Sequence, residues 1–293
     1  MWIGRTSRRW NRTVTRDANG VLANAAPYTL EGERPREPRT AILFIHGFDD
    51  TPEVWQLLAP RVHELTGVTC RAMRLPYISA PLRLQHRARL EHWLDAIRDE
   101  VARLRTCHKK VFLCGHSLGG GLAFLNSHVA DGVIVFAPLV HARRKHVWLF
   151  GLADVLLPFT RACRTPFPDP ITTRDGRVYA YTRDRYIAFA IYRAMFGMTK
   201  RLQKVGRGVP SAPRGVPIPG DAGTDGGGQG TARPTLAFIS LRDRLIDIPA
   251  TLRFLDGAKI ITTSDAGHVL PLDVGWEKRA EDVAAFVAGR DGE

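Results

Sequence analysis

The sequence holds few cysteines, and they are scattered. No two of the four form a Cys-x-x-Cys pair, so their spacing predicts neither a zinc site nor a dithiol redox motif. A chain of 293 residues can bury a core large enough to fold without disulfide bonds. We therefore expect free thiols in a reducing compartment, at Cys70, Cys107, Cys114 and Cys163.

Long apolar runs are also missing. No stretch reaches about 18 apolar residues, the length that predicts a membrane-spanning helix. The nearest, residues 147–159, is shorter and carries Asp154. The first 20 residues contain arginines but no apolar segment followed by a small-residue cleavage site, so they do not predict a secretory signal. These observations predict a cytoplasmic protein.

Acidic residues are scarce, and cofactor motifs are absent. Lys and Arg number 42 against 29 Asp and Glu, which gives a formal charge of +13. No basic stripe with interleaved aromatics appears, so we expect no nucleic-acid partner. The sequence also lacks a metal-ligand cluster, a phosphate-cradling glycine loop and a dinucleotide fingerprint, and we expect no cofactor. The simplest interpretation is an enzyme with an arginine-rich surface.

What the sequence does contain is a regular alternation of strands and helices. Short apolar runs typical of strands buried on both faces alternate with helical segments. Apolar residues recur at helical spacing over 90–104, and further helices are expected at 118–128 and 276–288. The pattern predicts an α/β fold with a mostly parallel sheet covered by helices on both faces. The expected strands cover 41–45, 68–76, 111–115, 132–138, 235–240 and 258–263.

The alternation stops at residue 139. Residues 139–205 show no clear strand and are rich in aromatic and basic side chains, which predicts a helical lid. Within 141–204 there are 13 Lys and Arg against 4 Asp and Glu. The Gly/Pro-rich segment 206–233 cannot bury enough apolar surface to order itself and is expected to be a disordered insertion. Residues 1–138 and 234–293 would then form the core domain.

The motif Gly-His-Ser-Leu-Gly, residues 115–119, lies between an expected strand and an expected helix. A G-x-S-x-G turn in this context holds a serine nucleophile on a strained backbone, and Gly115 and Gly119 provide the small neighbours that it needs. The amide of Leu118 could donate to an oxyanion. The alternative is a turn with only a structural role, but the flanking elements favour Ser117 as a nucleophile.

Candidate partners follow Ser117 in the order acid, then histidine. His268 comes after the expected strand 258–263 and is the only histidine beyond residue 146. Asp243 comes three residues after the strand 235–240, where it can meet a loop histidine at the carboxyl edge of the sheet. Asp247 is an alternative acid, although its position before Ile-Pro favours a helix cap.

The loop His46-Gly47-Phe48 follows the first long buried strand. In such folds this loop provides the second oxyanion donor, so the Phe48 amide is expected to pair with the Leu118 amide. His46 precedes the expected site and is interpreted as a structural residue. His116, beside the serine, is assigned no proton transfer.

These residues resemble the α/β-hydrolase superfamily, and more narrowly bacterial carboxylesterases and monoacylglycerol lipases with a small lid. The resemblance implies acyl transfer from an ester to Ser117 and then to water. It also implies that His268 acts as base and then as acid, and that Asp243 orients it. The matching segments are FIHGFDDTPEVWQLLAP (44–60), VFLCGHSLGGGLAF (111–124), LAFISLRDRLID (236–247) and SDAGHVLPLD (264–273).

Two departures from these esterases concern the substrate pocket. Asp50 stands where they often have glycine, and Tyr-Ile-Ser at 77–79 stands where they often have Gly-His-Gly. The leading hypothesis is a serine esterase acting on carboxylic esters of acyl or lipid-derived type. Acyl transfer to an alcohol, thioester or amide hydrolysis, perhydrolysis and a non-enzymatic binding module are the alternatives. The basic insertion either associates weakly with an anionic membrane surface or presents a solvated face.

Overall fold

The computed structural model describes residues 15–32, 40–141, 162–164, 171–172, 178–179, 183–184, 186–206 and 233–289. Apart from its first residue and its last, the Gly/Pro-rich segment 206–233 lies outside the described residues, as does most of 142–185. The disorder predicted for 206–233 therefore stays a prediction.

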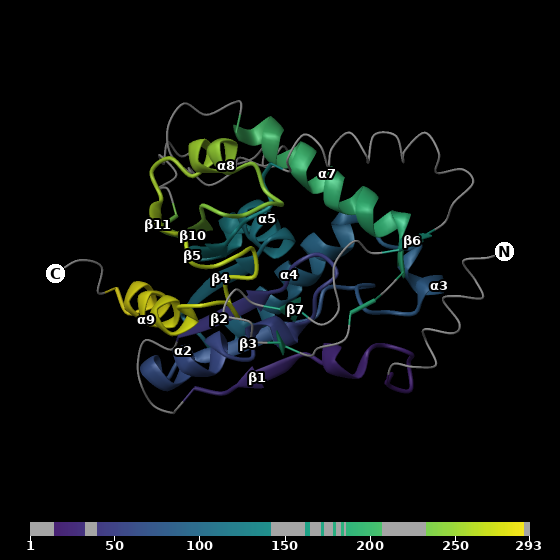
Figure 1. Cartoon of the computed structure of the whole chain (residues 1–293). Helices are drawn as coiled ribbons and strands as arrows, with labels where there is room; N and C mark the ends of the chain where they lie inside the picture. Colours follow the sequence, from purple (N-terminus) through teal and green to yellow (C-terminus); the bar gives the residue numbers. More distant parts are fainter. Residues whose placement is uncertain are drawn as a thin grey trace, which may run out of the picture.

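A seven-stranded sheet runs through the centre of the described residues (Figure 1). Every neighbouring pair is parallel except β1 with β3, so the predicted mostly parallel sheet is confirmed. The short edge strand β1 was not predicted. In spatial order the strands are β1 (Tyr28–Leu30), β3 (Thr69–Met73), β2 (Thr40–Ile45), β4 (Lys110–His116), β5 (Gly132–Phe136), β10 (Thr235–Ser240) and β11 (Lys259–Thr263).

Helices cover both faces of the sheet. On one face, α2 (Leu58–Thr66) packs against α9 (Trp276–Val287) (Figure 1). On the other, α4 (Leu90–Arg105), α5 (Leu118–Leu125) and α7 (Phe189–Gly206) contact one another. The shorter helices are α3 (Leu82–Gln85), α8 (Ile248–Phe254), η1 (Ala23–Ala25), η2 (Pro52–Trp55) and η3 (Ser127–Val129).

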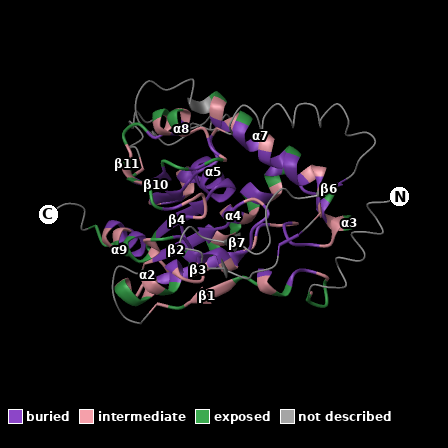
Figure 2. Ribbon diagram, in the orientation of Figure 1, coloured by how far each residue is buried: buried purple, intermediate pink, exposed green. Residues whose placement is uncertain are grey.

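The core lies between the sheet and these helices, as the buried residues in Figure 2 show. All six apolar positions that predicted the helix over 90–104 are buried on one face of α4. Strand β2 is buried at five of its six positions, as expected for a central strand covered on both sides. Parallel pairing of β4 with β5, of β5 with β10 and of β10 with β11 brings the carboxyl ends of β4, β10 and β11 to one edge of the sheet. The residues that follow these three strands meet there.

The expectation that residues 139–205 hold no strand is wrong. Two small antiparallel pairs occur there, β6 (Ala162–Arg164) with β9 (Tyr186–Ala188) and β7 (Ile171–Thr172) with β8 (Val178–Tyr179). Strands of two or three residues are too short to show an alternating pattern in the sequence. Within the described part of 139–205, the helical structure that the sequence predicted consists of α7. Among the described residues, no helix has the length and apolar character needed to cross a bilayer.

Candidate active site

Ser117 stands at the turn between β4 and α5. Its φ of 51° lies in the left-handed region, which a serine adopts only under strain. Small neighbours make the turn possible: a Cβ on Gly115 would lie 2.3 Å from the carbonyl oxygen of Gly119, and one on Gly119 would lie 2.1 Å from that of Ile45. The local geometry is therefore that of a nucleophile elbow.

The structure brings His268 and Asp243 to Ser117. Nε2 of His268 lies 2.9 Å from Oγ of Ser117, and its Nδ1 lies 2.5 Å from Oδ2 of Asp243. A carboxylate can only accept, so Nδ1 carries the ring proton and Nε2 is left to accept the serine hydroxyl. This is the tautomer that a general base requires.

Asp243 is buried and held on both carboxylate oxygens. Its Oδ1 accepts the backbone N–H groups of Leu245 at 2.8 Å and of Ile246 at 3.3 Å. Burial by itself would raise the pKa of this carboxyl, but His268 and the two amides together hold the pKa below its ordinary value. Asp243 is therefore ionised at neutral pH.

Asp247 does not join this group. Its Oδ1 accepts the N–H of Ala250 at 3.0 Å and caps the N-terminus of α8, as the sequence favoured. Its backbone N–H donates to the carbonyl oxygen of His141 at 2.8 Å. The alternative in which Asp247 orients His268 is not supported by this geometry.

The loop after β2 lies against the nucleophile. A Cβ on Gly47 would lie 3.4 Å from Cβ of Ser117, so even the smallest side chain at position 47 would touch the serine. The ring of Phe48 packs against Tyr192 of α7, with ring centroids 4.7 Å apart. Leu118 is the first residue of α5, where amides lack intrahelical acceptors. Of the two residues expected to donate to an oxyanion, Leu118 follows Ser117 in the chain, and Phe48 follows Gly47, the residue that approaches Ser117 in space.

Contacts from β10, from α9 and from within the loop itself hold the loop that carries His268. Oγ of Ser240 donates to the carbonyl oxygen of Ala266 at 2.7 Å, and Asp273 accepts the N–H of Gly267 at 2.5 Å. From α9, the buried Arg279 donates to the carbonyl oxygens of Leu270 at 3.0 Å and Asp273 at 2.7 Å. Sequence reasoning missed Asp273 and Arg279, because a supporting side chain has no motif of its own.

His46 has the structural role that the sequence predicted. Its Nδ1 donates to the carbonyl oxygen of Gly47 at 2.9 Å, and its Nε2 accepts the N–H of Leu75 at 3.0 Å. Burial lowers the pKa of His46 to about 4, so the ring is neutral at physiological pH. Both ring nitrogens are occupied, which leaves none for proton transfer.

A buried pair behind His268, Asp50 with His116, was not anticipated. Nε2 of His116 donates to the carbonyl oxygen of His268 at 3.1 Å, and Nδ1 lies 3.4 Å from Oδ2 of Asp50. Burial by itself would raise the pKa of Asp50, but His116 and the charge of Arg183 lower it to about 2. The only sequence signal was that Asp50 stands where related esterases often have glycine.

No group of three or more His, Cys, Asp or Glu side chains within the described part of the chain could hold a metal ion. The site has a serine on an elbow at the carboxyl edge of a parallel sheet, and a histidine links this serine to an aspartate through hydrogen bonds. This arrangement defines a class of protein, the hydrolases of the α/β type. Comparison with known proteins agrees. The sequence pattern of the alpha/beta hydrolase family matches residues 42–286, and the chain belongs to this family.

Solved structures of lipolytic enzymes share the fold. One of the two metagenome-derived lipolytic enzymes LipS and LipT is 17% identical, with a TM-score of 0.70 over 92% of this chain and 99% of the other. The Paleococcus ferrophilus monoacylglycerol lipase is 16% identical, with a TM-score of 0.66 over 91% and 99%. A soluble variant of the Saccharomyces cerevisiae monoglyceride lipase is 14% identical, with a TM-score of 0.67 over 91% of each chain. No curated protein sequence matches the chain significantly.

Proposed function

We propose that the protein is a serine hydrolase that cleaves carboxylic esters through an acyl-enzyme on Ser117. The observation that carries this proposal is the continuous line of hydrogen bonds from Ser117 Oγ through His268 to Asp243. A serine hydroxyl is a poor nucleophile at neutral pH and needs such a base and orienting acid. All three side chains follow strands of the sheet: Ser117 directly follows β4, and Asp243 and His268 lie on the loops after β10 and β11.

In the proposed acylation step, Nε2 of His268 takes the hydroxyl proton as Oγ of Ser117 bonds to the ester carbonyl carbon. The carbonyl oxygen becomes an oxyanion that the amides of Phe48 and Leu118 stabilise. Collapse of the intermediate breaks the bond to the alkoxy group. The imidazolium of His268 gives its proton to the departing alcohol.

Deacylation repeats these steps with water. His268 takes one proton from the water as the water oxygen attacks the acyl carbon. The bond between that carbon and Oγ of Ser117 then breaks, and His268 returns the proton to Oγ. The products are a carboxylic acid and the regenerated enzyme. The ionised Asp243 stabilises the imidazolium in both halves of the reaction. No cofactor enters this sequence.

We propose acyl or lipid-derived esters as substrates. The structural neighbours named above are lipolytic, and aromatic side chains from α7 meet the oxyanion loop beside Ser117. Tyr192 contacts Phe48 with ring centroids 4.7 Å apart and Phe189 with centroids 6.2 Å apart. We also propose that 1–138 and 234–293 act as the catalytic core and that 139–205 acts as its lid.

Labelling with a fluorophosphonate tests the proposed nucleophile. The wild-type protein should be labelled and the variant Ser117→Ala should not. Ser264→Ala is the matched control, because Ser264 is exposed on the loop that leads to His268. Labelling that persists in Ser117→Ala would contradict the assignment of the nucleophile.

A series of p-nitrophenyl esters from short to long acyl chains tests the substrate class. We expect hydrolysis by the wild type and none above background by Ser117→Ala. A protein that is labelled at Ser117 but cleaves no ester would contradict ester hydrolysis and favour acyl transfer or thioester chemistry. A protein that is not labelled at all would favour a binding module.

A further inference from the structure

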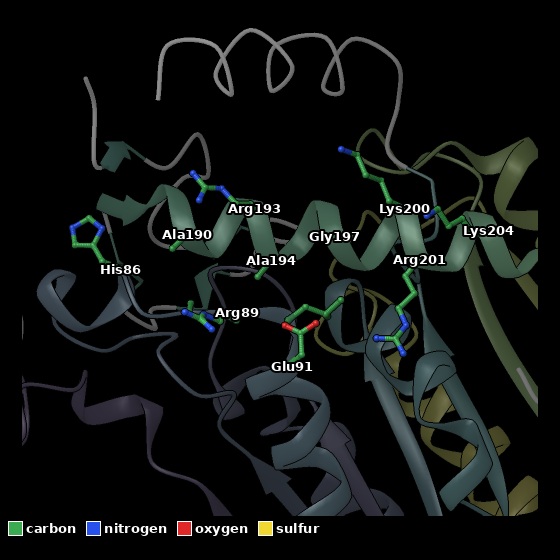
Figure 3. A pocket seen from close by; sticks show the side chains of 12 residues that line it. His86, Arg89, Glu91, Ala190, Arg193, Ala194, Gly197, Lys200, Arg201 and Lys204 are labelled. Atoms are coloured by element: carbon green, nitrogen blue, oxygen red, sulfur yellow. The ribbon is translucent and has the colours of Figure 1, made fainter. Parts of the chain in front are cut away.

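A cavity of about 670 Å³ lies between α7 and the residues that join α3 to α4 (Figure 3). This volume falls in the range of small-molecule sites, roughly 300–1,000 Å³. The cavity is separate from the candidate active site. Neither Ser117 nor Phe48 lines it, and Tyr192, which packs on Phe48, is not among its lining residues.

Helix α7 presents one cationic side to this cavity. The helix contains no acidic residue, and its four cations, Arg193, Lys200, Arg201 and Lys204, all line the cavity. Their spacing of seven, eight and eleven residues places them on one side of an α-helix. The opposite side of the helix, which includes Met198 and Leu202, is buried in the core.

The facing wall adds a fifth cation. Arg89 immediately precedes the first turn of α4, and Glu91 in that turn is the only carboxylate among the described lining residues. Figure 3 shows Arg89 and Glu91 below the part of α7 that carries Ala190 and Ala194. Arg201 extends toward the same side, so cations from α7 and from the α3–α4 connection approach the cavity from two directions.

These five cations differ from arginines elsewhere on the surface. On α4, Arg103 pairs with Glu100, and Arg98 pairs with Asp95. Within the described part of the chain, by contrast, no ion pair or hydrogen bond occurs at the side chains of the five cavity cations. Among the described lining residues, Glu91 is the one negative charge that can offset their mutual repulsion, and a bound anion would relieve the rest of it.

Small residues leave room for a ligand between the charges. Ala190, Ala194 and Gly197 follow one another along α7 beside the cations. A Cβ on Gly197 would meet only Cδ2 of Leu90, at 3.9 Å, so packing does not demand glycine there. Exposed Lys and Arg side chains reorient within nanoseconds and can close around a bound group.

We propose that this cavity, which we call the basic groove, binds the phosphate group of an anionic ligand. A phosphate offers several acceptor oxygens and up to two charges, and guanidinium groups match it with paired N–H donors. The five cations of the groove outnumber its one carboxylate, Glu91, by four. This excess of positive charge is larger than a ligand with a single carboxylate group would neutralise. The phosphate could belong to a phospholipid headgroup or to a soluble phosphate ester, and the experiment distinguishes these sources.

The test compares two double variants with the same change in net charge. Arg89→Gln/Arg201→Gln removes facing cations of the basic groove. Lys110→Gln/Arg253→Gln removes two exposed cations that lie on β4 and α8, outside the cavity. Binding is measured by co-sedimentation with phosphatidylcholine vesicles that contain phosphatidylglycerol, and by calorimetry with glycerol 3-phosphate. Neither measurement involves ester cleavage, so its outcome is independent of the proposed function.

We expect the groove variant to lose about 30-fold in affinity, since each cation near an anionic surface contributes roughly fivefold. The surface control should bind like the wild type. Loss of vesicle binding alone identifies a lipid headgroup, and loss of glycerol 3-phosphate binding identifies a soluble ester. Equal losses in both double variants, or no binding of either ligand by the wild type, would overturn the proposal.

A charge-retaining variant separates charge from folding. Arg89→Lys/Arg201→Lys should bind within about fivefold of the wild type, because it keeps both charges and loses only the guanidinium forks. Thermal unfolding of all three double variants checks that they fold. A loss of binding in the lysine variant as large as in the glutamine variant would overturn the electrostatic account.

Discussion

Replacing Asp243 by asparagine tests the proposed role of the Asp243–His268 hydrogen bond. Two backbone amides, from Leu245 and Ile246, donate to Oδ1 of Asp243. In Asp243→Asn the side-chain oxygen must take the Oδ1 position, because the amide nitrogen cannot accept those bonds. The nitrogen is then directed at Nδ1 of His268, which in the wild type lies 2.5 Å from Oδ2.

The consequence is a change of tautomer at His268. The amide nitrogen can only donate, so Nδ1 must accept and the ring proton must move to Nε2. Nε2 lies 2.9 Å from Oγ of Ser117 and, once protonated, cannot remove the serine proton. The equivalent change in a serine protease lowers kcat by about 10⁴. We expect a loss of roughly 10³–10⁴, or about 4–5.5 kcal/mol in the barrier.

The assay is the steady-state hydrolysis of a short p-nitrophenyl ester. Asp247→Asn is the matched control: Asp247 caps α8, and asparagine caps a helix as well as aspartate does, so kcat should stay within about twofold. Both replacements are nearly isosteric. An Asp243→Asn enzyme within about tenfold of the wild type would refute the tautomer argument. A large loss in Asp247→Asn instead would assign the orienting role to that residue.

Three further predictions concern the support of the site. Gly119→Ala should lower the free energy of unfolding by about 3 kcal/mol or more, because the new Cβ would lie 2.1 Å from the carbonyl oxygen of Ile45. Urea unfolding measures this loss, and the control Gly197→Ala should show no loss of unfolding free energy. Asp273→Ala should lower kcat by about 10–100-fold by releasing the His268 loop, and an unchanged kcat would contradict this. The pKa of Asp50 is about 2 against an ordinary 3.8. The ionised Asp50 therefore contributes fully to the free energy of unfolding above pH 3.8, and this contribution is lost as pH falls from 3.8 to 2. Over that interval the wild type should lose about 2 kcal/mol of unfolding free energy that Asp50→Asn does not lose, as unfolding at a series of pH values would measure.

The strands of the central sheet were predictable because each is a local apolar run. Residues 41–45 and 235–240 appear within one residue of their expected limits as β2 and β10. The same reasoning failed for β6 and β9, which pair over only three residues each. It also failed for β1, whose burial is intermediate throughout and leaves no apolar run.

The candidate residues of the site were predictable for a related reason. An elbow serine needs glycines nearby, and a strand end followed by an acid or a histidine is a local feature of the sequence. The supporting residues were not predictable. Asp50 and His116 are 66 positions apart, and Asp273 acts on the backbone of Gly267, so their roles exist only once the loops have folded together.

The sequence by itself determined the α/β class, the elbow at Ser117 and the order of the acid and histidine, because these depend on neighbouring residues. The sequence favoured Asp243 over Asp247 as the partner of His268, and the tertiary structure decided the geometry of that pair, through the burial of Asp243 beside two amides and the capping of α8 by Asp247. It also brought Arg89 opposite the cations of α7. Both results depend on the packing of segments far apart in the chain, and no local pattern records that packing.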